Sequence, residues 1–326
     1  SKKQIAELLD NVGASYNAFT SKEFTGYYIK VAKEHIGLAL DVVSDIYLNS
    51  TLEQREVEKE RKVILEELKM REDLPMLKAQ EVFEELLYGD TPAGWPVGGT
   101  RETVGRIRQE DIFNYYQLHY VAPATLVCLV SPLEHKDSLE KIKNYFATSR
   151  NENLSPKAPP IVTSQSKPGL LVKSKDTDQT HLNMGFRSFG LEHPDRFALE
   201  LLALILGGGM SSRLFQKVRE EEGLAYYVHA DCDFETDTGS LSIKAGCSHE
   251  KIGYALEAIL TEVISIKKNA VEPQELQKVK DQIKGQTALS LESSSDWASF
   301  YGEQEILRNK VLTPQEIFAV SDENTK

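Results

Sequence analysis

Residues 52–70 read LEQREVEKERKVILEELKM, and this stretch has the period of a half-buried helix. At about 100° per residue, Val57 and Ile64 share one side of the helix, while most of the charged residues gather on the other. Glu60 and Glu67 fall about 20° apart on the same wheel, within or beside the apolar stripe. We therefore expect two carboxylates that point inward, two turns apart.

Two interpretations of this helix are open. An ionised carboxylate that is buried without a partner costs several kcal/mol, so a cation, a hydrogen-bond network or a metal should meet Glu60 and Glu67. The alternative is an ordinary charged surface helix that is supported by Glu-to-Lys pairs, such as Glu58 with Lys62. The stretch by itself favours the charged surface helix.

An internal repeat extends the pattern to the rest of the chain. Residues 34–41, EHIGLALD, match residues 250–257, EKIGYALE, and residues 52–67 match residues 271–286 after a short insertion. Repeated text of this kind is typical of duplicated supersecondary units. The chain is therefore predicted to contain two homologous αβ modules.

The repeat also bears on the two carboxylates. Glu60 corresponds to Val279 in the second copy, and Glu67 corresponds to Gln286. The second copy keeps a helical pattern and lacks both carboxylates, so the fold does not require them. This difference favours a functional site in the first copy only.

The expected fold class is α+β, with a mostly antiparallel sheet covered by helices in each module. Residues 151–167 are polar, contain three prolines and form the natural boundary. The first module is then residues 1–150, and the second is residues 168–326. Repeat arithmetic places about forty residues of the first module ahead of Ser1 and leaves the second module cut at its end.

Local patterns predict the individual elements. A strand pair is expected within residues 14–32, and further strands are expected at 124–131, 169–175, 179–188, 225–234 and 239–246. Besides the helix at 52–70, helices are expected at 2–11, 35–48, 73–88, 138–146, 195–206, 213–222, 252–266 and 273–287, with short helices after Thr100.

Composition restricts the classes of partner. A net charge of -12 argues against nucleic acid or an anionic membrane as the main partner, because phosphate binding depends on an excess of Lys and Arg. The three cysteines show no CxxC spacing, so a reducing and therefore cytoplasmic location is expected. The sequence contains no run of 18 or more apolar residues, so no membrane-spanning helix is predicted.

Three motifs occur along the chain: ASYNAFTSKEFTGYY at 14–28, EKERKVILEEL at 58–68, and GGGMSSRLFQKVREEEGLAYYV at 207–228. With the duplicated frame, they resemble the insulinase and pitrilysin family of inverted-motif zinc peptidases. The resemblance covers essentially the whole chain and is strongest to the two-module branch that includes the mitochondrial processing peptidase. It implies two modules that face each other across a chamber.

The resemblance also implies a metal site. In this family an HxxEH helix supplies two histidine ligands and a glutamate base. Glu67 matches the third zinc ligand, and Glu60 matches a glutamate that supports a zinc-bound histidine. The HxxEH segment is expected ahead of Ser1, so zinc is expected in the intact protein and not in residues 1–326 alone, which are expected to be inactive.

Substrate contacts follow from the same resemblance. Asn17, Ala18 and Phe19 match an edge strand that pairs with an extended peptide. Arg219 and Tyr226 match the Arg and Tyr of the second module that reach the substrate carbonyl and the tetrahedral intermediate. The implied protein is a homodimeric metalloendopeptidase that hydrolyses peptides or unfolded protein segments by a zinc-activated water.

A different class of function is the alternative. Family members that lose the zinc motif serve as non-catalytic partner or scaffold subunits of the same fold. The presence of both Glu60 and Glu67 favours the enzyme, because a scaffold has no need for two inward carboxylates.

Overall fold

The computed structural model describes residues 1–153, 161, 165–308 and 310–323, and these residues pack as two compact units. Unit 1 comprises Ser1–Glu66, Val97–Ala158 and Ser290–Val311; unit 2 comprises Glu67–Pro96, Pro159–Leu289 and Leu312–Lys326. Residues 67–96 and 290–311 thus pack with the unit opposite to the one that the sequence boundaries suggest. The homologous modules at 1–150 and 168–326 stay a prediction. Most of the predicted linker, residues 154–160 and 162–164, lies outside the described residues.

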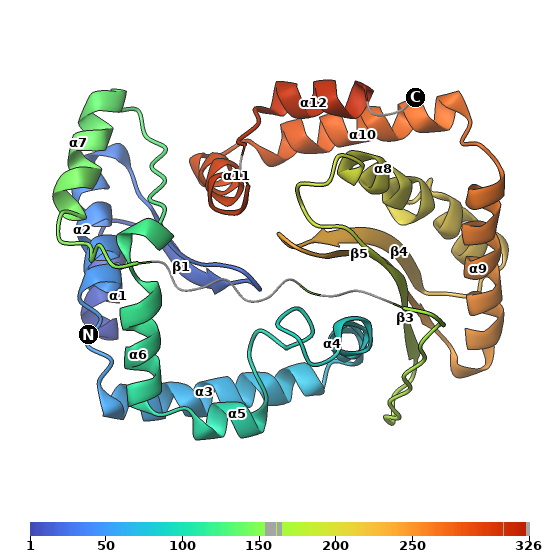
Figure 1. The fold of residues 1–326 in the computed structure, drawn as a ribbon, viewed down its shortest axis with the longest axis horizontal. Helices are drawn as coiled ribbons and strands as arrows, with labels where there is room; N and C mark the ends of the chain where they lie inside the picture. Colours follow the sequence, from blue (N-terminus) through green and yellow to red (C-terminus); the bar gives the residue numbers. More distant parts are fainter. Residues whose placement is uncertain (154–160, 162–164, 309, 324–326) are drawn as a thin grey trace. The chain divides into compact units, whose positions relative to one another are not determined.

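Unit 1 holds a two-stranded sheet and several helices; strand β1 and the helices are labelled in Figure 1. Its elements are α1 (Lys2–Asp10), β1 (Ser15–Thr20), β2 (Thr25–Lys30), α2 (Ile36–Leu48), α5 (Arg101–Arg106), α6 (Gln109–His119), α7 (His135–Tyr145) and α11 (Ser294–Leu307). Helix α3 (Gln54–Glu72) begins in unit 1 and ends in unit 2.

The strand pair expected within residues 14–32 is present as the antiparallel β1–β2 hairpin. The Ser21 N–H donates to the Phe24 carbonyl at 2.9 Å and closes the turn. The ring of Phe19 lies over Gly26, where an added Cβ would come within 2.3 Å of the ring. A side chain at residue 26 would therefore displace the Phe19 ring from this position.

Unit 2 contains a three-stranded antiparallel sheet in the order β3-β5-β4. Its elements are α4 (Pro75–Tyr88), β3 (Thr180–Ser188), α8 (Arg196–Gly207), a π-helical segment (Phe215–Glu221), β4 (Tyr227–Phe234), β5 (Gly239–Cys247), α9 (Ile252–Lys268), α10 (Pro273–Ser290) and α12 (Pro314–Glu323). The expected α+β fold, with antiparallel sheets and covering helices, is confirmed.

The main core of unit 2 forms on one face of this sheet. Central strand β5 alternates apolar residues such as Ile243 with polar residues such as Lys244, as a strand with two different faces should. Ile243 and the α9 residue Ile259 are both fully buried in one cluster, which also includes residues of α8 and β4. The sheet face that carries Ile243 therefore lies against this core, while Ser240 and Ser242 on the opposite face of β5 are buried as well.

A second, smaller core joins α10 to α8. Val279 of α10 is 0% exposed and packs with Leu201 and Ile205 of α8. The counterpart of Glu60 in the internal repeat is therefore a core residue.

Several local expectations differ from the structure. Residues 124–131 and 169–175 form no β-ladder among the described residues, and the side chain of Leu170 is 86% exposed. A strand needs a neighbour for its N–H and C=O groups, which local β-propensity cannot supply. The helix expected at 213–222 is π-helical over Phe215–Glu221. The sequence patterns also gave no indication of α11 and α12.

Within the part of the chain that the structure describes, none of the helices combines the length and the apolar character needed to cross a membrane.

Two substitutions on α9 test the position of the main core. Ile259→Ala removes a fully buried side chain and should lower the free energy of unfolding by about 2–5 kcal/mol, because it removes apolar contacts and leaves a cavity. Ile264→Ala on the same helix is the matched control, since Ile264 is 49% exposed, and it should change that value by less than about 1 kcal/mol. Urea unfolding checks both, and equal effects would place the core elsewhere.

Candidate functional site

Helix α3 carries the two carboxylates that the sequence singled out, together with several charged pairs. Glu58 pairs with Arg61 at 3.0 Å and not with Lys62, so the expected Glu58–Lys62 pair is wrong. No residue of α3 is fully buried. The helix therefore presents most of its charged residues to solvent.

Glu60 and Glu67 are both exposed, which corrects the expectation that they point inward. Within the described residues, neither side chain has a hydrogen bond or an ion pair. The matching position of the repeat shows what burial requires: Val279 is covered because α8 packs on it, whereas Glu60 is exposed among the described residues. Burial of this helix face depends on a packing partner and not on the pattern of α3 alone.

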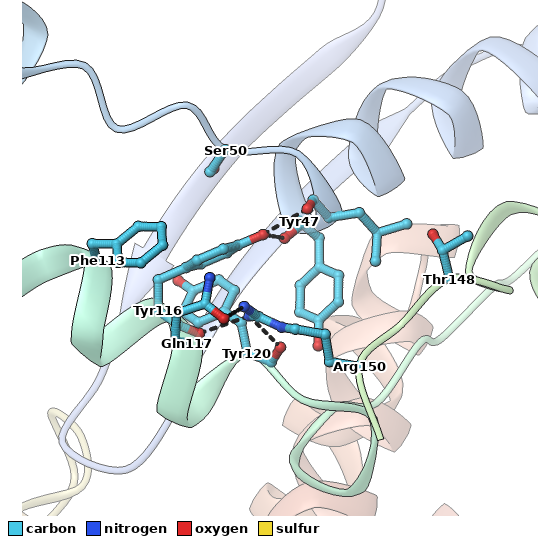
Figure 2. Close-up of a pocket in the computed structure, with 9 residues that line it drawn as sticks. Tyr47, Ser50, Phe113, Tyr116, Gln117, Tyr120, Thr148 and Arg150 are labelled. Atoms are coloured by element: carbon cyan, nitrogen blue, oxygen red, sulfur yellow. Dashed lines mark hydrogen bonds between the residues drawn. The ribbon is translucent and has the colours of Figure 1, made fainter. Parts of the chain in front are cut away.

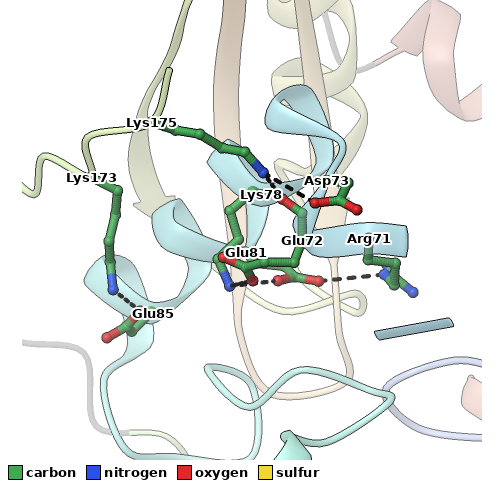
Figure 3. A network of polar contacts seen from close by, with 8 residues as sticks. All are labelled: Arg71, Glu72, Asp73, Lys78, Glu81, Glu85, Lys173 and Lys175. Carbon is green, nitrogen blue, oxygen red and sulfur yellow. Dashed lines mark hydrogen bonds and ion pairs between the residues drawn. The ribbon is translucent and has the colours of Figure 1, made fainter. Parts of the chain in front are cut away.

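The carboxyl-terminal end of α3, just after Glu67, is anchored to α4 by ion pairs (Figure 3). Lys78 lies 2.7 Å from the Glu72 carboxylate, and Arg71 lies 3.4 Å from that of Glu81. Burial lowers the pKa of Lys78, but hydrogen bonds and charge from Glu72 and Glu81 outweigh it, and the pKa lies above its ordinary value. These contacts fix the α3–α4 corner.

The extended segment at residues 173–175 also contacts the end of α3 and helix α4 (Figure 3). The Lys175 ammonium donates to the backbone carbonyl of Glu72 and lies 3.7 Å from the Asp73 carboxylate. Lys173 lies 3.9 Å from the Glu85 carboxylate on α4. Residues 173–175 thus hold the end of the helix that carries Glu67.

Arg219 and Tyr226 both belong to unit 2, on either side of the turn at Gly223. The Arg219 guanidinium lies 4.7 Å from the centre of the Phe215 ring, and the residue is exposed. Tyr226 is 60% exposed, while its backbone N–H donates to the Gly246 carbonyl at 2.8 Å. The Arg219 guanidinium also lies 3.9 Å from the Glu220 carboxylate, so it is exposed but not without partners. The Tyr226 side chain extends toward solvent from a backbone that is paired with β5.

Arg213 fixes the segment that leads to Arg219. Its Nε and Nη2 donate to the Glu275 carboxylate of α10 at 3.0 and 2.5 Å. The hydrogen bond from the guanidinium holds the pKa of Glu275 below its ordinary value, against the effect of partial burial. This two-point contact ties the start of the π-helical segment to α10.

The edge residues of β1 are exposed, as a strand that receives a peptide must be. The Ala18 N–H donates to Oδ1 of Asn17 at 2.9 Å, so an incoming peptide that uses this N–H must displace the asparagine side chain. Phe19 is engaged within the hairpin, where its ring meets Phe24 edge to face at 5.6 Å.

The described residues contain no group of three or more His, Cys, Asp or Glu side chains that could hold a metal ion. The exposed carboxylate of Glu67 fits one oxygen ligand of zinc, but a catalytic zinc needs three protein ligands. The described residues therefore do not supply a complete set of zinc ligands.

Sequence reasoning did not identify the residues that anchor the site. Arg213, Lys78 and Lys175 each act through a partner that is distant in the sequence or in another element. Spacing within one element carries no signal for such pairs. Of these three residues, only Arg213 lies in one of the motifs that the sequence singled out, at 207–228.

Two family models match the chain. Residues 1–101 match insulinase (peptidase family M16), and residues 106–283 match the peptidase M16 inactive domain. The zinc protease YmxG of Bacillus subtilis strain 168, itself described as uncharacterized, is 35% identical over 317 residues, which is 97% of this chain and 76% of that protein.

Solved structures show the same fold. A protease from Helicobacter pylori gives a TM-score of 0.86 at 23% identity and covers 98% of this chain and 81% of its own. The peptidase M16 inactive domain from Pseudomonas fluorescens gives a TM-score of 0.84 at 18% identity and covers 99% of this chain and 80% of its own. These likenesses agree with the resemblance that the three motifs indicated.

The Arg213–Glu275 pair predicts an acid-dependent loss of stability. Because the folded pKa of Glu275 is lowered, the pair contributes fully above the ordinary glutamate pKa of 4.5, and this contribution disappears as the pH falls through the lower folded value. Arg213→Met should cost about 1–2 kcal/mol of unfolding free energy at pH 7, and this difference should shrink below pH ~4.

Urea unfolding from pH 3.5 to 7 measures this difference. Lys217→Met is the control, since Lys217 forms an exposed pair with Glu221 in the same segment and should contribute little. A cost for Arg213→Met that does not change with pH would contradict this role of the pair.

Proposed function

Because the chain belongs to the insulinase family of peptidases, family M16, we propose that it acts as a zinc-dependent endopeptidase on peptides or unfolded protein segments. In this proposal Glu67 is a zinc ligand and Glu60 supports a metal-bound histidine. The two histidines and the catalytic base come from an HxxEH helix outside residues 1–326.

The packing of α10 against α8 carries this proposal. Val279 packs with Leu201 and Ile205, and the Gln282 side chain donates to the Gly208 carbonyl at the end of α8 at 3.2 Å. Under the repeat offset, Val279 corresponds to Glu60 and Gln282 to Val63. A helix that packed on α3 as α8 packs on α10 would cover the exposed Glu60. It would end near the helical turn of α3 that contains Glu67.

The two carboxylates suit different tasks at such a helix. Glu67 offers oxygen atoms with no hydrogen-bond partner among the described residues, and a carboxylate is a normal zinc ligand. Glu60 could accept a hydrogen bond from the second nitrogen of a ligating imidazole and so fix its tautomer. Zinc, when bound, would polarise the scissile carbonyl and lower the pKa of its water.

Arg219 and Tyr226 supply hydrogen-bond donors in this proposal. Arg219 and Tyr226 are both exposed; the Arg219 guanidinium rests over the Phe215 ring, and the Tyr226 main chain is bonded to Gly246. Donors that are aimed at the developing negative charge on a carbonyl oxygen lower the barrier to its attack. The peptide itself would add to the edge of β1 by main-chain hydrogen bonds, with Asn17, Ala18 and Phe19 beside it. Such pairing is tolerant of the peptide sequence.

A non-catalytic subunit of the same fold is the second candidate. The match of residues 106–283 to the M16 inactive domain favours it, as does the lack of a complete metal group among the described residues. The two candidates differ in one requirement: only the enzyme needs the Glu67 carboxylate for its activity. A homodimer is part of the first proposal, because one chain then carries Glu67, Arg219 and Tyr226 together.

Glu67→Gln, made in the complete encoded protein, tests the enzyme proposal. It removes the anionic ligand and should lower peptidase activity at least ~100-fold and reduce bound zinc, since ligand loss weakens metal binding. Glu66→Gln is the matched control, because Glu66 is the adjacent exposed glutamate on α3. Mass spectrometry of a mixture of unstructured peptides measures cleavage, and elemental analysis measures zinc.

Full activity and full zinc content in Glu67→Gln would overturn the assignment of Glu67. Absence of both cleavage and zinc from the unaltered protein would favour the non-catalytic subunit.

Tyr226→Phe tests the donor role in the second module. Loss of the hydroxyl should lower kcat about 10- to 1000-fold with little change in KM, because the hydrogen bond strengthens as charge develops on the substrate oxygen. Tyr254→Phe on α9 removes an equally exposed hydroxyl and should leave both constants unchanged. An increase in KM alone would assign Tyr226 to ground-state binding.

A further inference from the structure

Unit 1 contains a pocket of about 330 Å³ that the proposed peptidase chemistry does not use (Figure 2). It lies between the end of α2, helix α6 and the chain that follows α7. Its lining residues are Tyr47, Leu48, Ser50, Phe113, Tyr116, Gln117, Tyr120, Thr148 and Arg150. Pockets of this size hold small organic ligands.

The walls of the pocket are aromatic and rigid. The Tyr116 hydroxyl lies 2.8 and 2.7 Å from the carbonyls of Tyr47 and Leu48, and its single hydrogen is shared between them. The Tyr47 and Tyr120 rings stack with centroids 5.5 Å apart. Burial, followed by the hydrogen bond with the Tyr27 hydroxyl, raises the pKa of Tyr120, so this phenol stays neutral. A flat apolar group would find preformed surfaces here.

Arg150 is the only charged residue of the lining. Its Nη2 donates to the carbonyls of Tyr116 and Tyr120 at 2.8 Å each, and its Nη1 donates to Oε1 of Gln117. The guanidinium also lies 4.5 Å from the centre of the Tyr116 ring. These contacts hold the cation in one orientation, which Figure 2 shows.

The polar groups left over at this point are donors. An arginine has five N–H groups, and three of those of Arg150 are used by the contacts above, so its Nε–H and one Nη1–H have no partner among the described residues. Oε1 of the Gln117 amide accepts a hydrogen bond from Arg150, and the NH₂ group of the same amide remains as a donor. A ligand that matches this set must accept hydrogen bonds, and no carboxylate of the lining competes with an anion.

We propose that this pocket binds small organic carboxylates that carry a flat apolar group. The carboxylate would accept hydrogen bonds from Arg150 and Gln117, and the apolar group would contact Phe113, Tyr116 and Tyr47. Charge-assisted bonds to a guanidinium favour a planar carboxylate over a neutral group of the same shape. The lining includes neither Glu67 nor the residues of β1, and the ligand is either a free acid or the carboxyl terminus of a short peptide.

The probe is 3-phenylpropionate, compared with its neutral isostere 3-phenylpropionamide, in isothermal titration calorimetry and ligand-observed NMR on the whole protein. We expect saturable binding of the acid and at least tenfold weaker binding of the amide. N-acetyl-glycyl-phenylalanine extends the test to a peptide carboxyl terminus. Tighter binding of this dipeptide than of the free acid assigns the peptide source, and weaker binding assigns the free acid.

Gln117→Glu locates the binding to this pocket. It replaces the donor by a carboxylate that pairs with Arg150 and repels the ligand, so binding of the acid should weaken at least tenfold. Asn114→Glu is the matched control, since it places the same charge on the same helix at an exposed residue outside the lining. It should leave binding within about twofold. Circular dichroism shows whether each variant is folded, and Gln117→Ala replaces Gln117→Glu if that variant is not.

Equal binding of the acid and the amide would overturn the proposal, because recognition would then not depend on the carboxylate. Unchanged binding in the folded Gln117 variant would overturn it as well, because the probe would then bind elsewhere. Binding is measured without any peptidase assay, so the result is independent of the proposed function.

Discussion

A single helix, α3, carries both carboxylates of the candidate site and passes from one compact unit into the other. Because the helix is uninterrupted, the spacing between Glu60 and Glu67 follows from helical geometry. Just beyond Glu67, ion pairs of Glu72 with Lys78 and of Asp73 with Lys175 connect the end of the helix to neighbouring segments. Glu67 thus stands on a continuous helix whose end makes tertiary contacts.

The internal duplication shows how one helical pattern meets two environments. Val279 of α10 is fully buried against α8, whereas its counterpart Glu60 is exposed on α3. The two helices differ in what packs on them and not in their own periodicity. This difference is expected if both copies keep the same helix and only the first copy carries functional carboxylates.

Arginine serves two different purposes in this protein. Arg213 makes a two-point contact with Glu275 that fixes a segment, and its charge is matched by the carboxylate. Arg150 is held by backbone carbonyls and an amide oxygen, none of which carries a full negative charge. The first arginine is satisfied within the fold, while the second retains both charge and donors. This contrast makes the pocket at Arg150 a candidate ligand site.

The sequence by itself determined the features that depend on neighbouring residues. The helix at 52–70 and the hairpin within 14–32 were predictable, because periodicity and turn residues are local. The duplicated frame is a prediction from repeated text. The three motifs likewise indicated the family. The same local information identified Glu60 and Glu67 as unusual, although it gave the wrong exposure for both.

Only the tertiary structure decided which faces are covered. The apolar segments at 124–131 and 169–175 have strand-like composition, but no ladder forms without a neighbour that supplies the opposing N–H and C=O groups. Arg150 and Tyr116 meet because α6 and the chain after α7 fold together, and no spacing encodes that contact. Burial, pairing and pocket shape are properties of packing between distant segments, so they are absent from any single stretch of sequence.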